Sequence, residues 1–430
     1  MKTKMKKAAL GAAGTLFGLH LAVAQAANPI TGAIGETKPI LDTRLRDEYV
    51  DQLAAPALRQ ANAFTLRARF GFETGRAWST SLLAEGEAVA TLYHQQYRDD
   101  NAVALNTNYP VVADPKGVEL NRLQLTNIAI VDTTLVLGRQ RVNIDDQRFI
   151  GAAGWRQNEQ TLDMFRVTNR HVANLVLDGG YFNRVNRIYG PDSPQGKWKG
   201  RNWFANVAYQ TKIGKITGFG YSLDFDPITT VPAAMNPVRQ STATYGLRFA
   251  GDRIAGPLKV AYVASYAKQK DIGANPLKYD NHYSLLELYA TWKQYTFGVG
   301  DEVLSGYLAP GSSTPVGFAT PLATLHKFQG WADKFLTTPG NGIDDQYASL
   351  AWLKKGIGPF DTVSANLAWH HYTAERIQGN YGSEYNMLLA VKYHRPVMTL
   401  KYASYKAAAS TPTTVARDTD KLWFQVEYAY

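Results

Sequence analysis

Pairs of charged residues recur at every second position in several stretches of the chain. Side chains two positions apart on a β-strand point to the same face, so each pair would place its charged groups side by side. An arginine guanidinium can donate two parallel hydrogen bonds to one carboxylate. The spacing therefore predicts a surface that binds and guides carboxylate-bearing anions, formed by Arg44, Arg46, Arg67, Arg69, Arg139, Arg141, Glu85 and Glu87.

The acidic members of this set leave a second interpretation open. Opposite charges on neighbouring strands can pair with each other, and an exposed pair of this kind contributes less than about 1 kcal/mol. Glu85 and Glu87 would then hold arginines in place and leave fewer of them for a solute. The two interpretations are compatible, because a paired arginine still has unused donors.

Apolar residues alternate with these charges, which predicts β-strands with one wet face and one apolar face. In the stretch 64–74, Phe70 and Phe72 lie opposite Arg67 and Arg69. An unpaired buried charge costs several kcal/mol, so the arginines should face water and the phenylalanines lipid.

The same argument applied to the stretch 133–143 places Arg139 and Arg141 toward water. It places Val136 and Val142, which have the opposite parity, toward lipid.

Eighteen segments with strand-like patterns follow one another to the last residue. They are 40–51, 64–74, 78–93, 119–130, 133–143, 160–168, 174–184, 202–211, 215–224, 242–249, 259–268, 283–292, 295–301, 346–353, 360–371, 383–393, 397–405 and 421–430. Short turns and long loops alternate between them, and a soluble sandwich or propeller has no reason to keep that alternation. The pattern predicts an all-β fold, a transmembrane antiparallel β-barrel of about 18 strands, with short periplasmic turns and long extracellular loops.

The chain begins with four lysines, an apolar run from Ala8 to Ala24, and small residues before Ala27. This predicts a cleaved secretory signal peptide at 1–26 and a barrel at 27–430, in the outer membrane of a Gram-negative cell. The alternative, a membrane anchor, is disfavoured by a short apolar core rich in Gly and Ala.

Composition supports a barrel and disfavours several other classes. Aromatic residues make up 12% of the chain and suit the two girdles of a membrane barrel, so outer-membrane lipid is an expected partner. The net charge is +10 and four of the lysines lie in the signal segment, so nothing points to nucleic acid. The last strand ends on Tyr430, as in barrels that the barrel-assembly machinery recognises by their C-terminal strand.

The longest predicted connection, 302–345, is too long to be a structureless excursion unless it is functional or disordered. Apolar residues at spacings of three to four in LATLHKFQGWADKFL predict a short amphipathic helix. Its apolar face should pack on protein, either folded inward as a constriction, which we favour, or as a lid across the rim. The constriction residues would be Lys327, Trp331, Asp333 and Lys334.

Catalytic and metal-binding patterns are weak. The chain has no nucleophile elbow, no His-Glu-x-x-His pair and no phosphate-binding glycine loop, so we do not expect an enzyme or a cofactor. His370 and His371 point to opposite faces of a strand and cannot share a metal. Asp224 and Asp226 offer too few ligands for Ca²⁺ without further partners.

Several pieces together resemble the alginate-export family of outer-membrane channels: LRARFGFETG, TLVLGRQRVN with QRFIGAAGWRQNEQTLD, RVNRIYG, DEVLSG, and the segment 320–350. The resemblance covers about 40–430. It implies an eighteen-stranded barrel whose charged lumen guides an anionic polysaccharide, such as alginate, outward. None of the polysaccharide-contacting residues of that family is carried over to a position of this chain.

Export of an anionic polysaccharide is thus the function that the resemblance implies. An uptake porin for small organic anions or sugars is the alternative from the residues alone, and a membrane-embedded enzyme is a further one. The missing catalytic motifs weigh against the enzyme.

Overall fold

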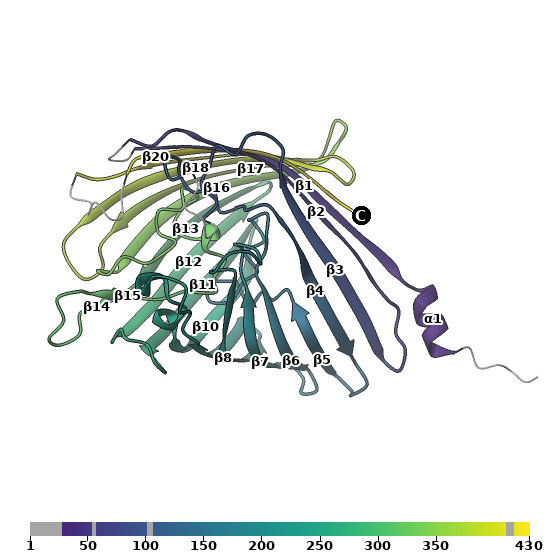
Figure 1. Ribbon diagram of the computed structural model, residues 1–430. Coiled ribbons are helices and arrows are strands. Elements are labelled where there is room, and N and C mark those ends of the chain that lie inside the picture. The colour runs from purple at the N-terminus through teal and green to yellow at the C-terminus, as the bar shows by residue number, and fades with distance from the viewer. Residues whose placement is uncertain (1–27, 54–56, 101–105, 410–416) are drawn as a thin grey trace, which may run out of the picture.

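The computed structural model describes residues 28–53, 57–100, 106–409 and 417–430 (Figure 1). Its main feature is an 18-stranded antiparallel sheet in which every strand pairs with its neighbours in the chain. The first strand also pairs with the last, from Asp42 opposite Ala429 to Gln52 opposite Thr419, and this closes the sheet into a barrel. The predicted barrel and its strand number are confirmed. The predicted signal peptide at 1–26 lies outside the described residues.

All eighteen predicted segments correspond to strands of the wall. These are β1 (Lys38–Gln52), β2 (Ala61–Glu73), β3 (Thr80–Thr91), β4 (Gly117–Asn127), β5 (Thr133–Gln140), β6 (Thr161–Asn169), β7 (Leu175–Asn186), β8 (Lys197–Thr211), β9 (Gly214–Phe225), β10 (Thr242–Ala255), β11 (Leu258–Asp271), β12 (Asp280–Trp292), β13 (Tyr295–Leu304), β16 (Ile343–Ile357), β17 (Phe360–Thr373), β18 (Asn380–Lys392), β19 (Val397–Lys406) and β20 (Thr419–Ala429).

The remaining elements are small. The helix α1 (Pro29–Gly35) precedes the wall, and its N-terminus is capped by Asn28, whose side chain accepts a hydrogen bond from the Ile30 amide at 3.0 Å. The loops carry β14 (Gly306–Tyr307), β15 (Val316–Gly317), η1 (Ala233–Met235), η2 (Pro237–Gln240) and η3 (Leu325–Lys327). Within the described part of the chain, no helix is both long and apolar enough to cross a membrane.

The strands alternate between an inner and an outer face, as β8 shows most clearly. Trp198, Asn202 and Phe204 are buried inside the barrel, whereas the intervening Arg201 and Trp203 are exposed outside. Inward and outward residues alternate because successive side chains of a strand point to opposite faces. The wall therefore has the pattern expected of a barrel with lipid around it.

The predicted faces of β5 are wrong. Leu137 is 57% exposed and lies opposite Leu125 on β4 and Phe165 on β6, which are exposed as well, so its parity is the outer one. Val136 instead lies opposite Arg166, which pairs with Asp178 inside the barrel. The two apolar residues look alike in sequence, and only the neighbouring strands decide which of them meets lipid.

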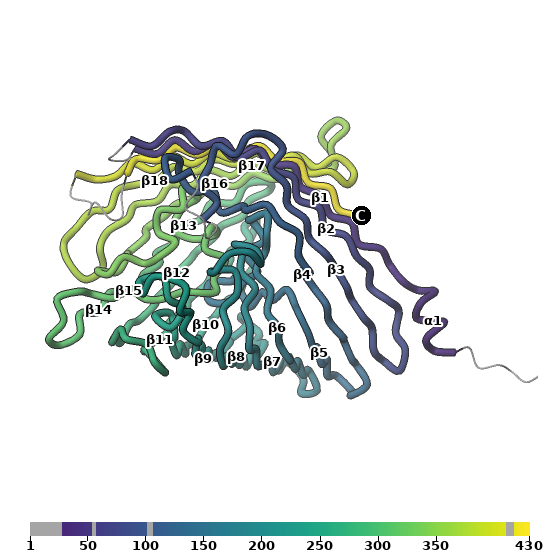
Figure 2. Tube along the Cα trace, viewed as in Figure 1, coloured from purple at the N-terminus to yellow at the C-terminus, as the bar shows by residue number. Residues whose placement is uncertain are grey.

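Long loops gather at one end of the barrel, the loop end, and short connections at the other, the turn end (Figure 2). Two loops reach into the interior: loop A, residues 141–160, and loop B, residues 305–342. They are hydrogen-bonded to each other, because the Gly151 amide donates to the Leu322 carbonyl at 2.8 Å and the Thr324 amide donates to the Gln147 carbonyl at 3.1 Å.

Loop B does not contain the predicted amphipathic helix. Only the three residues of η3 are helical, and the chain then passes through Gln329, Gly330 and Asp333 with positive φ angles of 48°, 78° and 59°. Residues in this left-handed region cannot continue a right-handed helix. The apolar residues Leu322, Ala332 and Phe335 are nonetheless buried, so the spacing reflected burial rather than a helix.

An apolar core forms where loops A and B pack on the inner wall, with wall residues from strands between β6 and β20. Phe149 of loop A packs against it, with ring-centroid distances of 5.2 Å to Phe219, 5.3 Å to Tyr283 and 6.2 Å to Phe318. Leu322 of loop B is buried in the same cluster. Aromatic contacts of this kind hold both loops inside the barrel.

Candidate functional site

Arg44 and Arg46 lie on the inner face of β1, but they are occupied by loop A. Arg44 donates hydrogen bonds to the carbonyls of Gly154, Trp155 and Arg156 at 3.0, 2.9 and 3.1 Å, and Arg46 donates to the Trp155 carbonyl at 2.6 Å. Arg46 is fully buried. These two arginines therefore fix the position of loop A, and their donors do not point into an open lumen.

The next inward charges belong to an ion-pair cluster on β2, β3 and β4. Arg67 pairs with Asp42, and Arg69 pairs with Glu87 and, at 3.3 Å, with Glu159 of loop A. Arg67, Arg69 and Glu87 belong to the predicted set, and Asp42 of β1 and Glu159 of loop A join them.

Glu85 completes this cluster from β3. Its carboxylate accepts hydrogen bonds from Arg122 at 2.5 and 2.9 Å and from Asn121 at 2.8 Å. A buried charge needs partners of opposite sign, and here arginines and glutamates neutralise one another. The interpretation of paired charges thus describes Glu85 and Glu87 in this structure.

Arg139 and Arg141 do not share a site. Arg141, just past the end of β5, pairs with Glu159 at 2.5 Å and with Glu85 at 3.5 Å, so it joins the interior cluster. Arg139 has the parity of the outward Leu137 and binds Asp163 through two nitrogens at 2.7 and 3.2 Å. Arg139 was expected to line the lumen with the other arginines. The structure corrects this expectation, because the faces of β5 are the reverse of the predicted ones.

The four predicted loop B residues all lie near the inner wall or loop A. Lys327 donates to the Asp146 carbonyl of loop A at 2.7 Å, and the Trp331 amide donates to Asn386 of β18 at 3.3 Å. Lys334 donates to the Thr419 hydroxyl of β20 at 3.0 Å. Loop B thus folds into the barrel, and its role as a constriction stays a prediction.

Asp333 is the ionic centre of loop B. Its carboxylate forms ion pairs with Arg156 of loop A at 2.9 Å and Lys421 of β20 at 2.8 Å, and it lies 2.7 Å from His326 Nδ1. Burial alone would raise the pKa of Asp333, but these three neighbours hold it well below its usual value. Burial, together with the cations of Lys401 and Arg156, lowers the pKa of His326 well below its usual value. Asp333 is therefore ionised, and His326 is neutral at physiological pH.

Tryptophan rings surround Lys401 of β19 next to this centre. Its Nζ lies 4.0 Å from the ring centroid of Trp155 and 3.9 Å from that of Trp331, and 2.6 Å from His326 Nε2. The neutral imidazole can accept this hydrogen bond while its other nitrogen bonds Asp333. Cation–π contacts thus join both loops to the inner wall.

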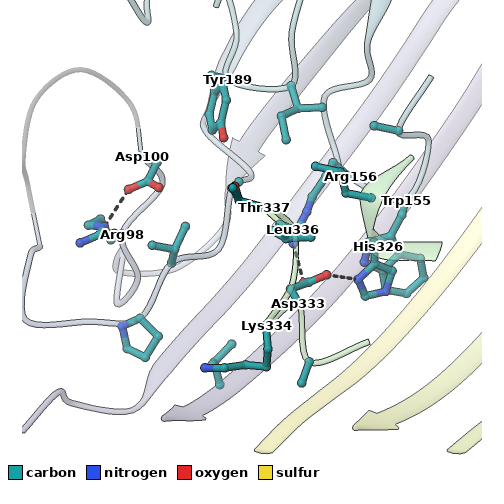
Figure 3. Close-up of a pocket in the computed structure, with 18 of the residues that line it drawn as sticks. Arg98, Asp100, Trp155, Arg156, Tyr189, His326, Asp333, Lys334, Leu336 and Thr337 are labelled. Atoms are coloured by element: carbon teal, nitrogen blue, oxygen red, sulfur yellow. Dashed lines mark hydrogen bonds and ion pairs between the residues drawn. The ribbon is translucent and has the colours of Figure 1, made fainter. Parts of the chain in front are cut away.

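A cavity of about 490 Å³ opens between the loops at the loop end of the barrel (Figure 3). Figure 3 shows that its lining comes from both interior loops, from the β3–β4 connection and from the β7–β8 connection. Among the described residues, the charged groups that line it are Arg98, Arg156, Arg187, Lys334, Lys421, Asp100 and Asp333, and its aromatic residues include Tyr109, Trp155 and Tyr189.

Positive charge is in excess in this cavity. Asp100 pairs with Arg98 at 2.7 Å, and Asp333 is shared by Arg156 and Lys421. Lys334, by contrast, has only a neutral hydroxyl as its hydrogen-bond partner among the described residues. Burial, followed by the charge of Lys421, lowers the pKa of Lys334 to about 8. An anion that entered would be attracted by this ammonium group and would in turn favour its protonated form.

Sequence reasoning found two of the cavity's charged residues, Asp333 and Lys334, and missed the others. Arg156 and Arg187 lie in loops, where alternation carries no information. Lys421 is on β20 with the inward parity, and a signal for it was present, because it alternates with the outward Leu422 and Phe424. Within the described residues, no cluster of three histidines or carboxylates could hold a metal ion.

The barrel is the fold of known outer-membrane proteins. OpdK of Pseudomonas aeruginosa, solved with vanillate, superposes with a TM-score of 0.65 at 14% sequence identity, over 91% of this chain and 98% of that one. OccK5 (OpdH) of the same organism gives 0.64 at 12% identity, over 93% and 99%. OccK2 (OpdF), in complex with glucuronate, gives 0.63 at 13% identity, over 93% and 99%. No family model and no curated protein matches the sequence.

The resemblance to the alginate-export family is therefore wrong. Solved structures that share this barrel include OpdK and OccK proteins, and the sequence matches no family model. The eighteen strands that the resemblance implied are present all the same. The pieces LRARFGFETG and TLVLGRQRVN lie mostly in strands, whose alternation is set by the barrel wall and shared by barrels of different function, whereas much of the rest falls in loops A and B.

Proposed function

We propose that this protein is an outer-membrane channel for the uptake of small organic anions, with the cavity between the loops as its first binding site. The observation that carries the proposal is the excess of positive charge around Lys334 in a cavity that is open at the loop end. In an outer-membrane barrel, the end with long loops faces the medium. A carboxylate arriving from outside therefore meets this cavity before the interior ion pairs.

The size of the cavity favours a small solute over a polymer. A volume of about 490 Å³ lies in the range of sites for small molecules. Loops A and B fill the interior beside it and are hydrogen-bonded to each other, which leaves little width for a polysaccharide chain. The ligands named for OpdK and OccK2, vanillate and glucuronate, are single-ring carboxylates, and they support this class of solute.

The aromatic lining adds a preference for ring-bearing anions. The rings of Tyr109, Trp155 and Tyr189 line the cavity together with its cations. A ring can stack on these side chains while its carboxylate meets Lys334. We expect benzoate-type anions to bind more tightly than acetate, with hexuronates between them.

Solute transport tests the proposal directly. Proteoliposomes containing the purified barrel should take up radiolabelled benzoate and glucuronate faster than protein-free liposomes do, and glucuronate faster than uncharged glucose of similar size. Lys334→Gln should reduce anion uptake about 10-fold, since a hydrogen bond to a charged group contributes about 1.5–3 kcal/mol. Lys327→Gln, in the same loop but outside the cavity lining, is the matched control. Equal uptake of anions and neutral solutes by the unmodified protein would contradict the proposal.

The pH dependence of anion binding provides a second test. Because the pKa of Lys334 is about 8, its ammonium form prevails below that pH and is lost as the pH rises through it. Benzoate affinity, measured by calorimetry at low ionic strength, should therefore fall about 10-fold between about pH 7 and pH 9. Arginine stays protonated throughout this range, so Lys334→Arg should remove the dependence. An affinity that is constant in the unmodified protein would exclude Lys334 as the anion ligand.

A further inference from the structure

A group of cations lies on the outer face of the wall, at the loop end of β5, β7 and β8. We call it the outer cationic patch, and it comprises Arg139, Arg184, Lys197, Lys199 and Arg201. On β8 the patch residues face outward. Lys197, Lys199 and Arg201 are exposed and alternate with the buried Trp198, Gly200 and Asn202. These side chains point away from the lumen and take no part in the cavity between the loops.

The outer cationic patch borders the lipid-facing apolar residues of the wall, which we call the apolar belt. The outward residues of β8 run from Lys197, Lys199 and Arg201 to Trp203 and then to Val207 toward the turn end. The ring of Trp203 packs on Tyr181 of β7 at a centroid distance of 4.5 Å. Exposed tryptophan and tyrosine mark the level at which the hydrocarbon of the membrane meets the headgroups. The cations thus lie at the headgroup level of the outer leaflet.

The five cations of the patch outnumber the carboxylates near them, which are Asp163, Asp224 and, interacting with Arg139 and Lys197, Glu119 of β4. Asp163 is bound by Arg139 and lies 3.4 Å from Arg184, and Asp224 lies 2.9 Å from Arg201. Among the described residues, Lys197 and Lys199 have no carboxylate within ion-pair distance. The Arg201 side chain is 78% exposed, so its pair with Asp224 contributes at most about 1 kcal/mol and can exchange for another anion.

Two like charges face each other inside the patch. Arg184 and Lys199 are direct cross-strand partners in the ladder between β7 and β8. Like charges in this position destabilise a sheet. An anion with several oxygens, bound between the two side chains, would turn this repulsion into two charge-assisted hydrogen bonds.

We propose that the outer cationic patch binds the phosphate groups of the lipid A that forms the outer leaflet. Phosphate carries several acceptor oxygens and up to two negative charges, which suits adjacent arginine and lysine side chains. The acyl chains of the same molecule would lie along Trp203 and Val207 below the patch. The lipid is thus held by a charged headgroup site continuous with the apolar belt. This site is independent of the solute that passes through the barrel.

Native mass spectrometry of the detergent-solubilised, folded protein tests this proposal with diphosphoryl lipid A and chemically dephosphorylated lipid A as probes. The unmodified protein should retain diphosphoryl lipid A at least 10-fold better than the dephosphorylated form. A Lys197→Gln, Lys199→Gln, Arg201→Gln variant should lose that preference. The matched control carries Lys354→Gln, Lys355→Gln and Lys392→Gln at the turn end and should keep it. Millimolar inorganic phosphate should not displace the lipid.

Three results of this experiment would count against the proposal. Equal retention of the two lipids by the unmodified protein, or an unchanged preference in the triple variant, would overturn the proposal. Displacement by inorganic phosphate would show a simple anion site and would overturn the assignment to lipid. If the triple variant does not assemble into a heat-modifiable barrel, Arg201→Gln alone decides, because so exposed a side chain is not needed for folding. It should reduce retention about threefold, and full retention would count against the site.

Discussion

Replacing Asp333 with asparagine should raise the single-channel conductance several-fold while the barrel stays assembled. The carboxylate is the shared counter-ion of Arg156 and Lys421 and accepts the hydrogen bond of His326. Removing one partner of a buried ion pair costs about 3–5 kcal/mol, because the remaining charges are left uncompensated. Loop B would be released from β20 and loop A, and the interior would widen.

Planar-bilayer recordings at about 1 M salt are the appropriate measurement. At that ionic strength the screening length is about 3 Å, so conductance reports the width of the pore more than its charge. Asp100→Asn is the matched control, since its pair with Arg98 has both side chains 38% exposed and is worth about 1 kcal/mol or less. An unchanged conductance in Asp333→Asn would mean that loop B does not limit the pore or is held by its other contacts.

Leu137→Arg should prevent assembly of the barrel in the membrane, whereas Val136→Arg should be tolerated. Leu137 is exposed on the outer face between Leu125 and Phe165. A lipid-facing arginine costs about 2–4 kcal/mol at the middle of the bilayer and less toward its interfaces. Val136 points inward toward Arg166 and Asp178, where a charged group can reach a carboxylate.

The fraction of heat-modifiable protein in the membrane fraction measures this difference. Both variants introduce one arginine, at adjacent positions, so the two proteins have the same net charge and differ only in the face that carries the new side chain. Leu137→Arg should leave little assembled barrel, and Val136→Arg should remain close to the unmodified protein. The reverse result would restore the faces that the sequence predicted for β5.

The strands of this barrel were predictable from sequence because each one carries its own alternation. The inner faces of β1, β2 and β3 were also predictable, since several charges per strand share one parity, as Arg67 and Arg69 do on β2. The faces of β5 were not. Arg139 is one residue from the end of that strand and Arg141 lies beyond it, so neither charge reports on the part of β5 that crosses the bilayer. Alternation shows that two faces differ, and it identifies the lipid face only when charges lie mid-strand.

The site was less predictable than the wall, because its partners are far apart in the chain. Asp333 meets Arg156 and Lys421 only after both the barrel and its interior loops are in place. No local sequence pattern predicts contacts between residues so far apart in the chain. The failed helix in loop B has the same origin, since contacts of Trp331 and Ala332 with Glu384 outweigh the helical preference of the segment.

The seam between β1 and β20 determines when the interior can be completed during biogenesis. Arg44 contacts both Glu427 of β20 and the backbone of loop A, and Arg46 likewise contacts both Gln425 and Trp155. The strands that form the seam come from opposite ends of the chain, so this pairing closes the largest chain loop of the fold. Loop A therefore finds its full set of partners only in a finished barrel. An inserting chain would pass through a stage with a closed wall and an unseated loop A, when the nascent pore is most permeable to the medium.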